Sequence, residues 1–307
     1  MKRTWFILLL CIQALGITAR SNKELYKTLD SLISCYDKLT AEKEQRINSI
    51  KQSMGNITLT PEQTYDLNIR LYDEYMAYRF DSAYYYINKN VTALRGTADH
   101  QRFAASAIRM AHILSVSGLF GRVHNLLGEI NPDSLNDEQK IAYYNQQSEL
   151  NLYRSEMAQY TDYFTEYIQQ AQYYRQLIIQ IAPQNSQDYV FNQATYISEQ
   201  GDNDKAIEML ESNLLQLQEG TRDYSIVTST LAYFYHKKGD VSQQERYLLL
   251  SAISDERGAI RENNSLRSLA EILMELGDND EAYHYLFQAI SEAKFYGSRI
   301  RMMQVGR

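Results

Sequence analysis

The sequence predicts an all-α protein made of antiparallel helix pairs that stack into a right-handed superhelix, an α-solenoid. The chain has 307 residues with only 3 Pro and 13 Gly, and so few helix breakers favour long helices. Three Gly-Asp pairs, beginning at Gly201, Gly239 and Gly277, recur every 38 residues. A fixed period of this length is typical of helical repeats, in which each helix pair buries its apolar face by stacking on its neighbours.

The first nineteen residues read as a secretory signal peptide. Lys2 and Arg3 precede an apolar run over 5–12, and small residues follow up to Ala19. The predicted location is therefore exported and periplasmic, and an uncleaved signal anchor is the alternative that leaves the protein on the membrane. Cys11 would permit lipid attachment, but the large Leu10 before it argues against that. After signal removal Cys35 is the sole cysteine, so no internal disulfide is expected.

Downstream of the signal, the residues over 22–54 are expected to form one long helix. Their apolar residues, from Leu25 and Leu29 to Ile47 and Ile50, recur at spacings of three and four. The segment over 62–186 is predicted to hold degenerate helix pairs, of which the one around Gly118 fits the repeat pattern best. The pair after it has no Gly at its turn, near position 159.

Three clear repeats cover 187–297. Around each Gly-Asp pair a small Ala precedes the Gly by seven residues and a Leu follows it by nine, at Ala194, Ala232, Ala270, Leu210, Leu248 and Leu286. The Ala would let the helices approach closely, and the Gly would end the first helix in a left-handed turn. We expect Asp204 and Asp280 to cap second helices, and Ser242 with Glu245 to form a capping box.

These residues resemble the tetratricopeptide repeat (TPR), which places small Ala residues in both helices around a turn containing Gly. Ala206, Ala282 and Ala289 fit the second-helix positions of that repeat, whereas Gln244 and Ser251 depart from it. The period also exceeds the usual length of about 34 residues by roughly one helical turn, so the helices should be longer than standard.

Beyond the third repeat, the residues over 298–307 begin another helix. Solenoids need a polar capping helix at each edge, and this segment does not supply one. Either the natural protein therefore continues past Arg307, or this sequence is a truncated product. Any membrane contact other than a signal anchor would come from a part beyond Arg307.

Chemical motifs are absent from the sequence. It lacks the Gly-rich phosphate loops, HExxH, CxxC and GxSxG patterns, so we predict no enzyme activity and no cofactor. His112 and His236 occupy groove-facing positions, but no further ligand recurs at metal spacing, so no metal is predicted. The net charge of −7 is spread along the chain without a Lys/Arg stripe, which excludes direct nucleic-acid binding by this segment.

A binding groove is the predicted functional site. The chain contains 26 Tyr, whose rings with polar tips suit peptides or sugars. If the superhelix turns as in the TPR proteins that the chain resembles, the inner face of the first helices presents the following residues: Phe191, Thr195, Ser198, Ser229, Tyr233, His236, Lys237, Arg267, Glu271 and Met274.

A narrower resemblance is carried by Leu29-Asp30, Tyr36, the run over 42–47, Leu71-Tyr72 and Asp81-Ser82-Ala83. With the signal peptide, these residues look like the exported N-terminal sensor half of a Bacteroidetes family of TPR membrane regulators carrying a domain of unknown function. The resemblance implies a periplasmic sensor of a membrane-bound transcriptional regulator that binds a peptide or protein segment, or a glycan, for signal transduction. The alternatives are a free periplasmic scaffold or adaptor, and a glycan-binding surface protein that would require acylation at Cys11.

Overall fold

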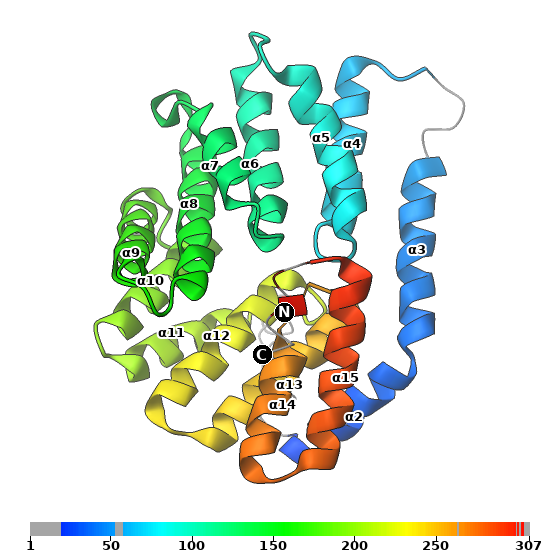
Figure 1. Ribbon diagram of the computed structural model, residues 1–307, viewed down its shortest axis with the longest axis vertical. Helices are drawn as coiled ribbons and strands as arrows, with labels where there is room; N and C mark the ends of the chain where they lie inside the picture. Colours follow the sequence, from blue (N-terminus) through cyan, green and yellow to red (C-terminus); the bar gives the residue numbers. More distant parts are fainter. Residues whose placement is uncertain (1–19, 53–57, 263, 299, 301, 304–307) are drawn as a thin grey trace, which may run out of the picture. The chain divides into compact units, whose positions relative to one another are not determined.

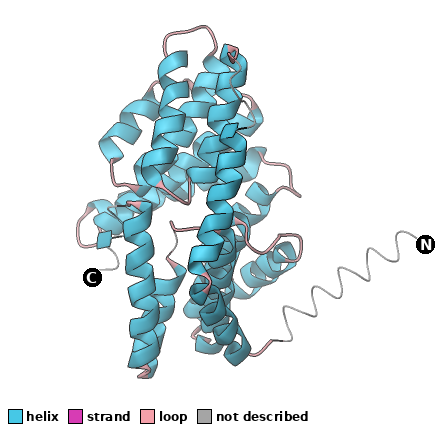
Figure 2. Cartoon of the chain, turned by 90° about the vertical axis from the view of Figure 1, so that its right-hand side faces the viewer, coloured by secondary structure: helices cyan, strands magenta, loops and turns pink. Residues whose placement is uncertain are grey.

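The computed structural model describes residues 20–52, 58–262, 264–298, 300 and 302–303. Within these ranges the chain forms fourteen α-helices and one short 3₁₀ helix, Pro132–Ser134, with no strand (Figure 1). Figure 2 shows the same part of the chain as helices joined by loops. The prediction of an all-α helical-repeat solenoid is therefore confirmed. The predicted signal peptide over 1–19, with Cys11, lies outside the described residues.

The described helices form two compact units. The first unit takes residues within 1–41 and 197–289, and the second takes residues within 42–196 and 290–307. The boundaries fall inside three helices: α3 (Tyr36–Gln52), α10 (Gln187–Glu199) and α15 (Asn279–Tyr296).

The first unit contains the hairpins that the 38-residue period predicts. Its helices are the end of α10, α11 (Asn203–Leu214), α12 (Arg222–Lys238), α13 (Val241–Gly258), α14 (Ser265–Leu276) and most of α15. Gly201, Gly239 and Gly277 stand at the turns with φ of 95°, 74° and 84°. Because side chains with a Cβ are strained in this region, the recurring Gly is explained by the backbone that the turn requires.

The small and apolar positions of the repeat supply the core of the first unit. Ala232 and Ala270 are buried, and so are Leu210 and Leu248, whereas Leu286 is partly exposed. Helix α12 packs against α13, and the small Ala232 of α12 is buried in the core. The sequence pattern thus identified four of these five core positions.

The predicted helix caps are wrong by two residues. Asp202, Asp240 and Asp278, the Asp of each Gly-Asp pair, accept hydrogen bonds from the backbone N–H three residues on, at 3.1, 3.0 and 3.4 Å. Asp204 and Asp280 lie in the first helical turn instead, where a carboxylate still favours the positive end of the helix dipole. Each Gly-Asp pair therefore ends one helix and begins the next.

Helix α2 (Asn22–Ser34) is anchored on α13 and α15 within the first unit. The Tyr26 hydroxyl donates to a Glu245 carboxylate oxygen at 2.6 Å, and the Tyr285 hydroxyl donates to Asp30 Oδ1 at 2.7 Å. The rings of Tyr26 and Tyr285 stack with centroids 6.1 Å apart. Burial and the carboxylate acceptors raise the pKa of both phenols. Glu245 thus binds α2 and does not form the capping box predicted with Ser242.

The single helix predicted over 22–54 is wrong, because the chain turns at Cys35 between α2 and α3. The Cys35 N–H reaches the carbonyls of Leu32 and Ser31 at 3.0 and 3.2 Å, which tightens the last turn of α2. Leu29 is buried in the first unit and Ile47 in the second. The apolar spacing continues through the turn, so periodicity alone could not reveal it. Residues 53–57 lie outside the described residues.

A cluster of charged side chains is buried where α13 ends and α14 begins. Arg261 Nη1 donates to Glu256 Oε2 at 2.8 Å, and the two side chains are 0% and 1% exposed. The Arg261 guanidinium also lies 4.2 Å from the ring centroid of Tyr36. Nearby, the buried Asp255 accepts a hydrogen bond from the Ser265 hydroxyl at 3.2 Å. Charges are rarely this deep unless they are paired, so the cluster is expected to be sensitive to any change.

The second unit contains three further helix pairs. Its helices are the rest of α3, α4 (Pro61–Tyr75), α5 (Phe80–Leu94), α6 (His100–Val116), α7 (Phe120–Gly128), α8 (Asp137–Met157), α9 (Tyr163–Ile181), most of α10 and the end of α15. Within pairs, α4 packs on α5, α6 on α7 and α8 on α9. Gly118 has φ of 79° at the α6–α7 turn, as the repeat pattern predicts, and the α8–α9 turn has no Gly.

The last described residues take part in the core of the second unit. Ile300 and Tyr296 pack with Val116 and Tyr153 in one buried cluster. The Ser298 hydroxyl donates to the Val116 carbonyl at 2.7 Å. Ile300 is helical, in the segment over 298–307 where a helix was predicted to begin, and positions 299, 301 and 304–307 lie outside the described residues.

Candidate binding surface

Helix α12 carries four of the predicted groove residues along one side. Ser229, Tyr233, His236 and Lys237 are spaced by four, three and one, which aligns them on one helical face. Tyr233 is 58% exposed, and the Lys237 ammonium lies 5.9 Å from its ring centroid. The Ser229 hydroxyl donates to the Ile226 carbonyl and is therefore engaged within the helix. Tyr233 is the largest open group on this face.

The end of α12 is tied to the end of α10. Lys237 Nζ donates to the carbonyl and the hydroxyl of Ser198, at 2.7 and 2.9 Å. His236 Nδ1 lies 3.3 Å from Gln244 Oε1, which links α12 to α13. Ser198 is only 1% exposed and its hydroxyl also bonds Asn203, so its predicted place on an open groove face is wrong. Its role is structural, because it holds the Lys237 ammonium.

Helix α14 carries the other three predicted groove residues of the first unit. Arg267 Nε donates to Asn264 Oδ1 at 2.7 Å, and its guanidinium also pairs with Glu271 one turn along. Both contacts are local, so the guanidinium is oriented while part of it still reaches solvent. The Met274 side chain is 55% exposed. Arg267 and Met274 therefore present a fixed cation and an apolar group on the same helix.

Phe191 and Thr195 lie on α10 in the second unit and are half-buried. The Thr195 hydroxyl donates to the Phe191 carbonyl at 2.8 Å, a bond inside the helix that leaves little capacity for a ligand. The predicted residues thus share faces within single helices. The exposed ones among them are Tyr233, His236, Lys237, Glu271 and Met274. The Arg267 side chain is 20% exposed.

Sequence reasoning missed a group of exposed apolar residues on the α14–α15 hairpin. Leu276, Tyr283 and Phe287 are exposed, and none was assigned to the groove. The prediction considered only the first helix of each repeat, whereas Tyr283 and Phe287 belong to the second. Tyr283 and Phe287 are four residues apart, so they share one face of the helix, while other apolar residues of the helix fall on a different face. This pattern in the sequence could have indicated a second apolar face.

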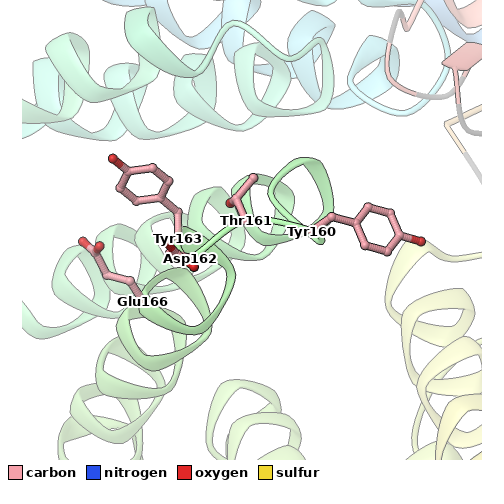
Figure 3. Close-up of a pocket in the computed structure, with 5 residues that line it drawn as sticks. All are labelled: Tyr160, Thr161, Asp162, Tyr163 and Glu166. Carbon is pink, nitrogen blue, oxygen red and sulfur yellow. The ribbon is translucent and has the colours of Figure 1, made fainter.

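A shallow depression lies at the turn between α8 and α9, lined by Tyr160, Thr161, Asp162, Tyr163 and Glu166. Figure 3 shows that the two tyrosine rings point in opposite directions and that the side chains diverge. A small-molecule site needs polar groups that converge on one point. This turn therefore offers exposed aromatic groups but no enclosed site.

The described residues contain no group of three His, Cys, Asp or Glu side chains that could hold a metal ion. His112 is buried, with Nδ1 2.8 Å from a Glu149 oxygen across the α6–α8 contact, so it joins two helices. Cys35 is a free and exposed thiol. Among the described helices, none has the length and apolar character needed to cross a bilayer.

Comparison with known families agrees with this architecture. The family model described as the SusR N-terminal TPR domain matches residues 33–307. A search of curated proteins found no match. The match confirms the resemblance to TPR proteins and to the N-terminal part of SusR-like Bacteroidetes regulators. The chain belongs to the SusR N-terminal TPR domain family, whose non-catalytic helical-repeat fold mediates the binding of proteins or peptides.

Proposed function

We propose that the chain is the periplasmic sensor part of a SusR-type, membrane-bound transcriptional regulator. In this proposal the open face of its first helices binds a peptide or protein segment, and the bound state is passed to the regulatory part of the protein. Family membership over residues 33–307 and the predicted signal peptide over 1–19 support the proposal. A free periplasmic scaffold would use the same face without passing on a signal.

Tyr233 is the observation that carries the proposal. Its ring is largely exposed in the middle of a helix whose end is fixed to two neighbouring helices through Lys237 and His236. An exposed tyrosine on a rigid frame gives a large contact area at little entropic cost, because only two torsions must be fixed on binding. Arg267, oriented by Asn264, supplies a planar donor for a carboxylate or carbonyl of the ligand.

Replacing Tyr233 or Arg267 by Ala is expected to lower capture of the ligand by about tenfold, since interface hot spots of these types contribute about 1–2 kcal/mol or more. The protein covering 20–307 is immobilised, incubated with periplasmic extract, and washed, and the retained molecules are quantified by mass spectrometry. Circular dichroism melting of each variant checks that it remains folded.

Tyr160→Ala is the matched control, because Tyr160 is 95% exposed at the α8–α9 turn of the second unit and is not one of the residues of the proposed face. Its capture should equal that of the unmodified protein. Equal capture by Tyr233→Ala, Arg267→Ala and Tyr160→Ala would refute the proposed face. A retained species that is an oligosaccharide would assign the face to a glycan instead of a peptide.

Export is expected to remove the residues up to Ala19, so that the mature protein begins at Arg20. The check is mass spectrometry of the N-terminal peptide from periplasmic material. An acylated N-terminus at Cys11 would replace the periplasmic proposal with a lipid-anchored surface protein, and an intact Met1 would indicate a retained signal anchor.

A further inference from the structure

The turn end of the α14–α15 hairpin carries a concentration of exposed apolar side chains. Met274, Leu276, Tyr283 and Phe287 are between 55% and 76% exposed. All four lie within about three helical turns of Gly277, where the two helices join (Figure 1). Large side chains this open and this close in sequence are unusual on a surface with no partner.

The packing of the hairpin explains why these residues are left open. Helix α14 buries Leu269 and Leu273 and packs against α13, and α15 buries Tyr285, whose hydroxyl bonds Asp30 of α2. Tyr283 and Phe287 are one turn apart on a different face of α15 from Tyr285. The apolar residues in question therefore lie on faces that neither α13 nor α2 covers.

The same hairpin also carries exposed carboxylates. Five acidic side chains of the hairpin are exposed: Glu271, Glu275, Asp278, Asp280 and Glu281. Over 265–289, all of which the structure describes, Arg267 is the one Lys or Arg, and it is paired with Glu271. The hairpin surface thus combines apolar groups with a strongly negative rim.

The negative charge of the hairpin favours some binding partners over others. A symmetric contact with a second copy would bring the same carboxylates face to face, which is unfavourable. An anionic lipid surface is repelled for the same reason. A helical segment with apolar residues on one side and Lys or Arg beside them would match both features of the hairpin.

We propose that the α14–α15 hairpin is a docking surface for a basic amphipathic helix of a partner protein. Tyr283 and Phe287 contact the apolar side of that helix, and Glu275 and Asp280 face its cations. The surface shares Met274 with the predicted groove, but its contacts through Tyr283, Phe287, Glu275 and Asp280 involve none of the groove residues and do not depend on what the face around Tyr233 binds.

The test uses two fluorescein-labelled peptides of identical amphipathic pattern, one of Leu and Lys and the other of Leu and Glu. Fluorescence anisotropy with the protein covering 20–307 should show binding of the Lys peptide and none of the Glu peptide. Phe287→Ala combined with Tyr283→Ala should weaken binding about tenfold. Glu275→Lys combined with Asp280→Lys should weaken it at least as much, because the rim then repels the probe.

Asp162→Lys combined with Glu166→Lys is the matched control, since it makes the same change of charge at the α8–α9 turn and should leave the affinity unchanged. If the control pair lost as much affinity for the Lys peptide, the effect would be due to the overall charge of the protein, and the proposal would be overturned. Unchanged binding of the Lys peptide by the variant with Phe287→Ala and Tyr283→Ala would also overturn it. Self-association abolished by Phe287→Ala in sedimentation would assign the surface to a second copy and likewise overturn it. Tyr233→Ala, which tests the proposed function, should not affect the Lys peptide, so the two proposals can fail separately.

Discussion

Arg261→Ala is expected to lower the free energy of unfolding by about 3–5 kcal/mol, because it removes one partner of a fully buried ion pair. The Glu256 carboxylate, 2.8 Å from the guanidinium and 1% exposed, would be left in the interior without that donor. The substitution also removes the cation from its contact with the Tyr36 ring, which joins the start of α3 to the junction of α13 and α14. Chemical denaturation followed by circular dichroism measures the loss.

Two further variants separate the buried charge from other causes. Arg261→Met combined with Glu256→Leu should cost less than Arg261→Ala alone, since neither charge then remains uncompensated. Lys238→Ala, which removes the exposed pair with Asp204, should cost less than about 1 kcal/mol. If Arg261→Ala were as mild as Lys238→Ala, the ion pair would not stabilise the fold.

Much of the repeat architecture could be predicted because it depends on local backbone chemistry. A left-handed turn requires Gly, so Gly201, Gly239 and Gly277 mark the hairpin turns directly in the sequence. The helix caps were misplaced, because Gly201 and Gly277 are each followed by two Asp residues and Gly239 by Asp240 and Ser242, and only the backbone geometry decides which one reaches the free N–H groups. Cys35 shows the limit of periodicity, since the apolar spacing runs unbroken through a turn.

The buried ionic cluster could not be predicted, because burial depends on tertiary packing. The run from Glu256 to Glu262 reads as a polar loop after a helix, and nothing in its spacing distinguishes a solvated charge from a buried one. Ala259, at φ of 50°, turns the chain after α13 in the left-handed region that Gly occupies at positions 201, 239 and 277. Only the approach of Tyr36, more than two hundred residues away in sequence, completes the site around Arg261.

The candidate binding residues were predictable to the extent that helical spacing decides which side chains share a face. The four residues on α12 and the three on α14 fall on such faces, and Tyr233 and Met274 are exposed. Ser198 was misplaced because a small hydroxyl gives no sign of whether it is buried. Phe287 was missed because the groove was sought only on the first helix of each repeat, and Phe287 lies on a second helix.

Asp255→Asn is expected to remove a pH dependence of stability that the unmodified protein has between about pH 4 and 7. Burial raises the pKa of Asp255 from 3.8 to about 7, with the charges of Glu256 and Glu262 adding to the effect and hydrogen bonds from Ser225 and Ser265 opposing it. In the unfolded chain the carboxyl loses its proton near its ordinary pKa, while the folded protein retains the proton up to about pH 7. The unfolded state therefore binds fewer protons in this window, and stability falls as pH rises through it.

The contribution of Asp255 to the pH dependence of stability is large enough to be measured beside the contributions of the other carboxylates. A shift of this extent corresponds to a difference on the order of 2–4 kcal/mol between pH 4 and pH 8. Asn has nearly the shape of a protonated Asp and does not titrate, so the variant should match the unmodified protein near pH 4 and exceed its stability at pH 8. Urea denaturation at both pH values gives the two free energies, and Asp223→Asn, at an exposed position of α12, controls for the loss of one negative charge. A difference between Asp255→Asn and the unmodified protein that stays constant from pH 4 to pH 8 would mean that Asp255 is ionised in the folded core, and that the cluster around Arg261 tolerates a third negative charge.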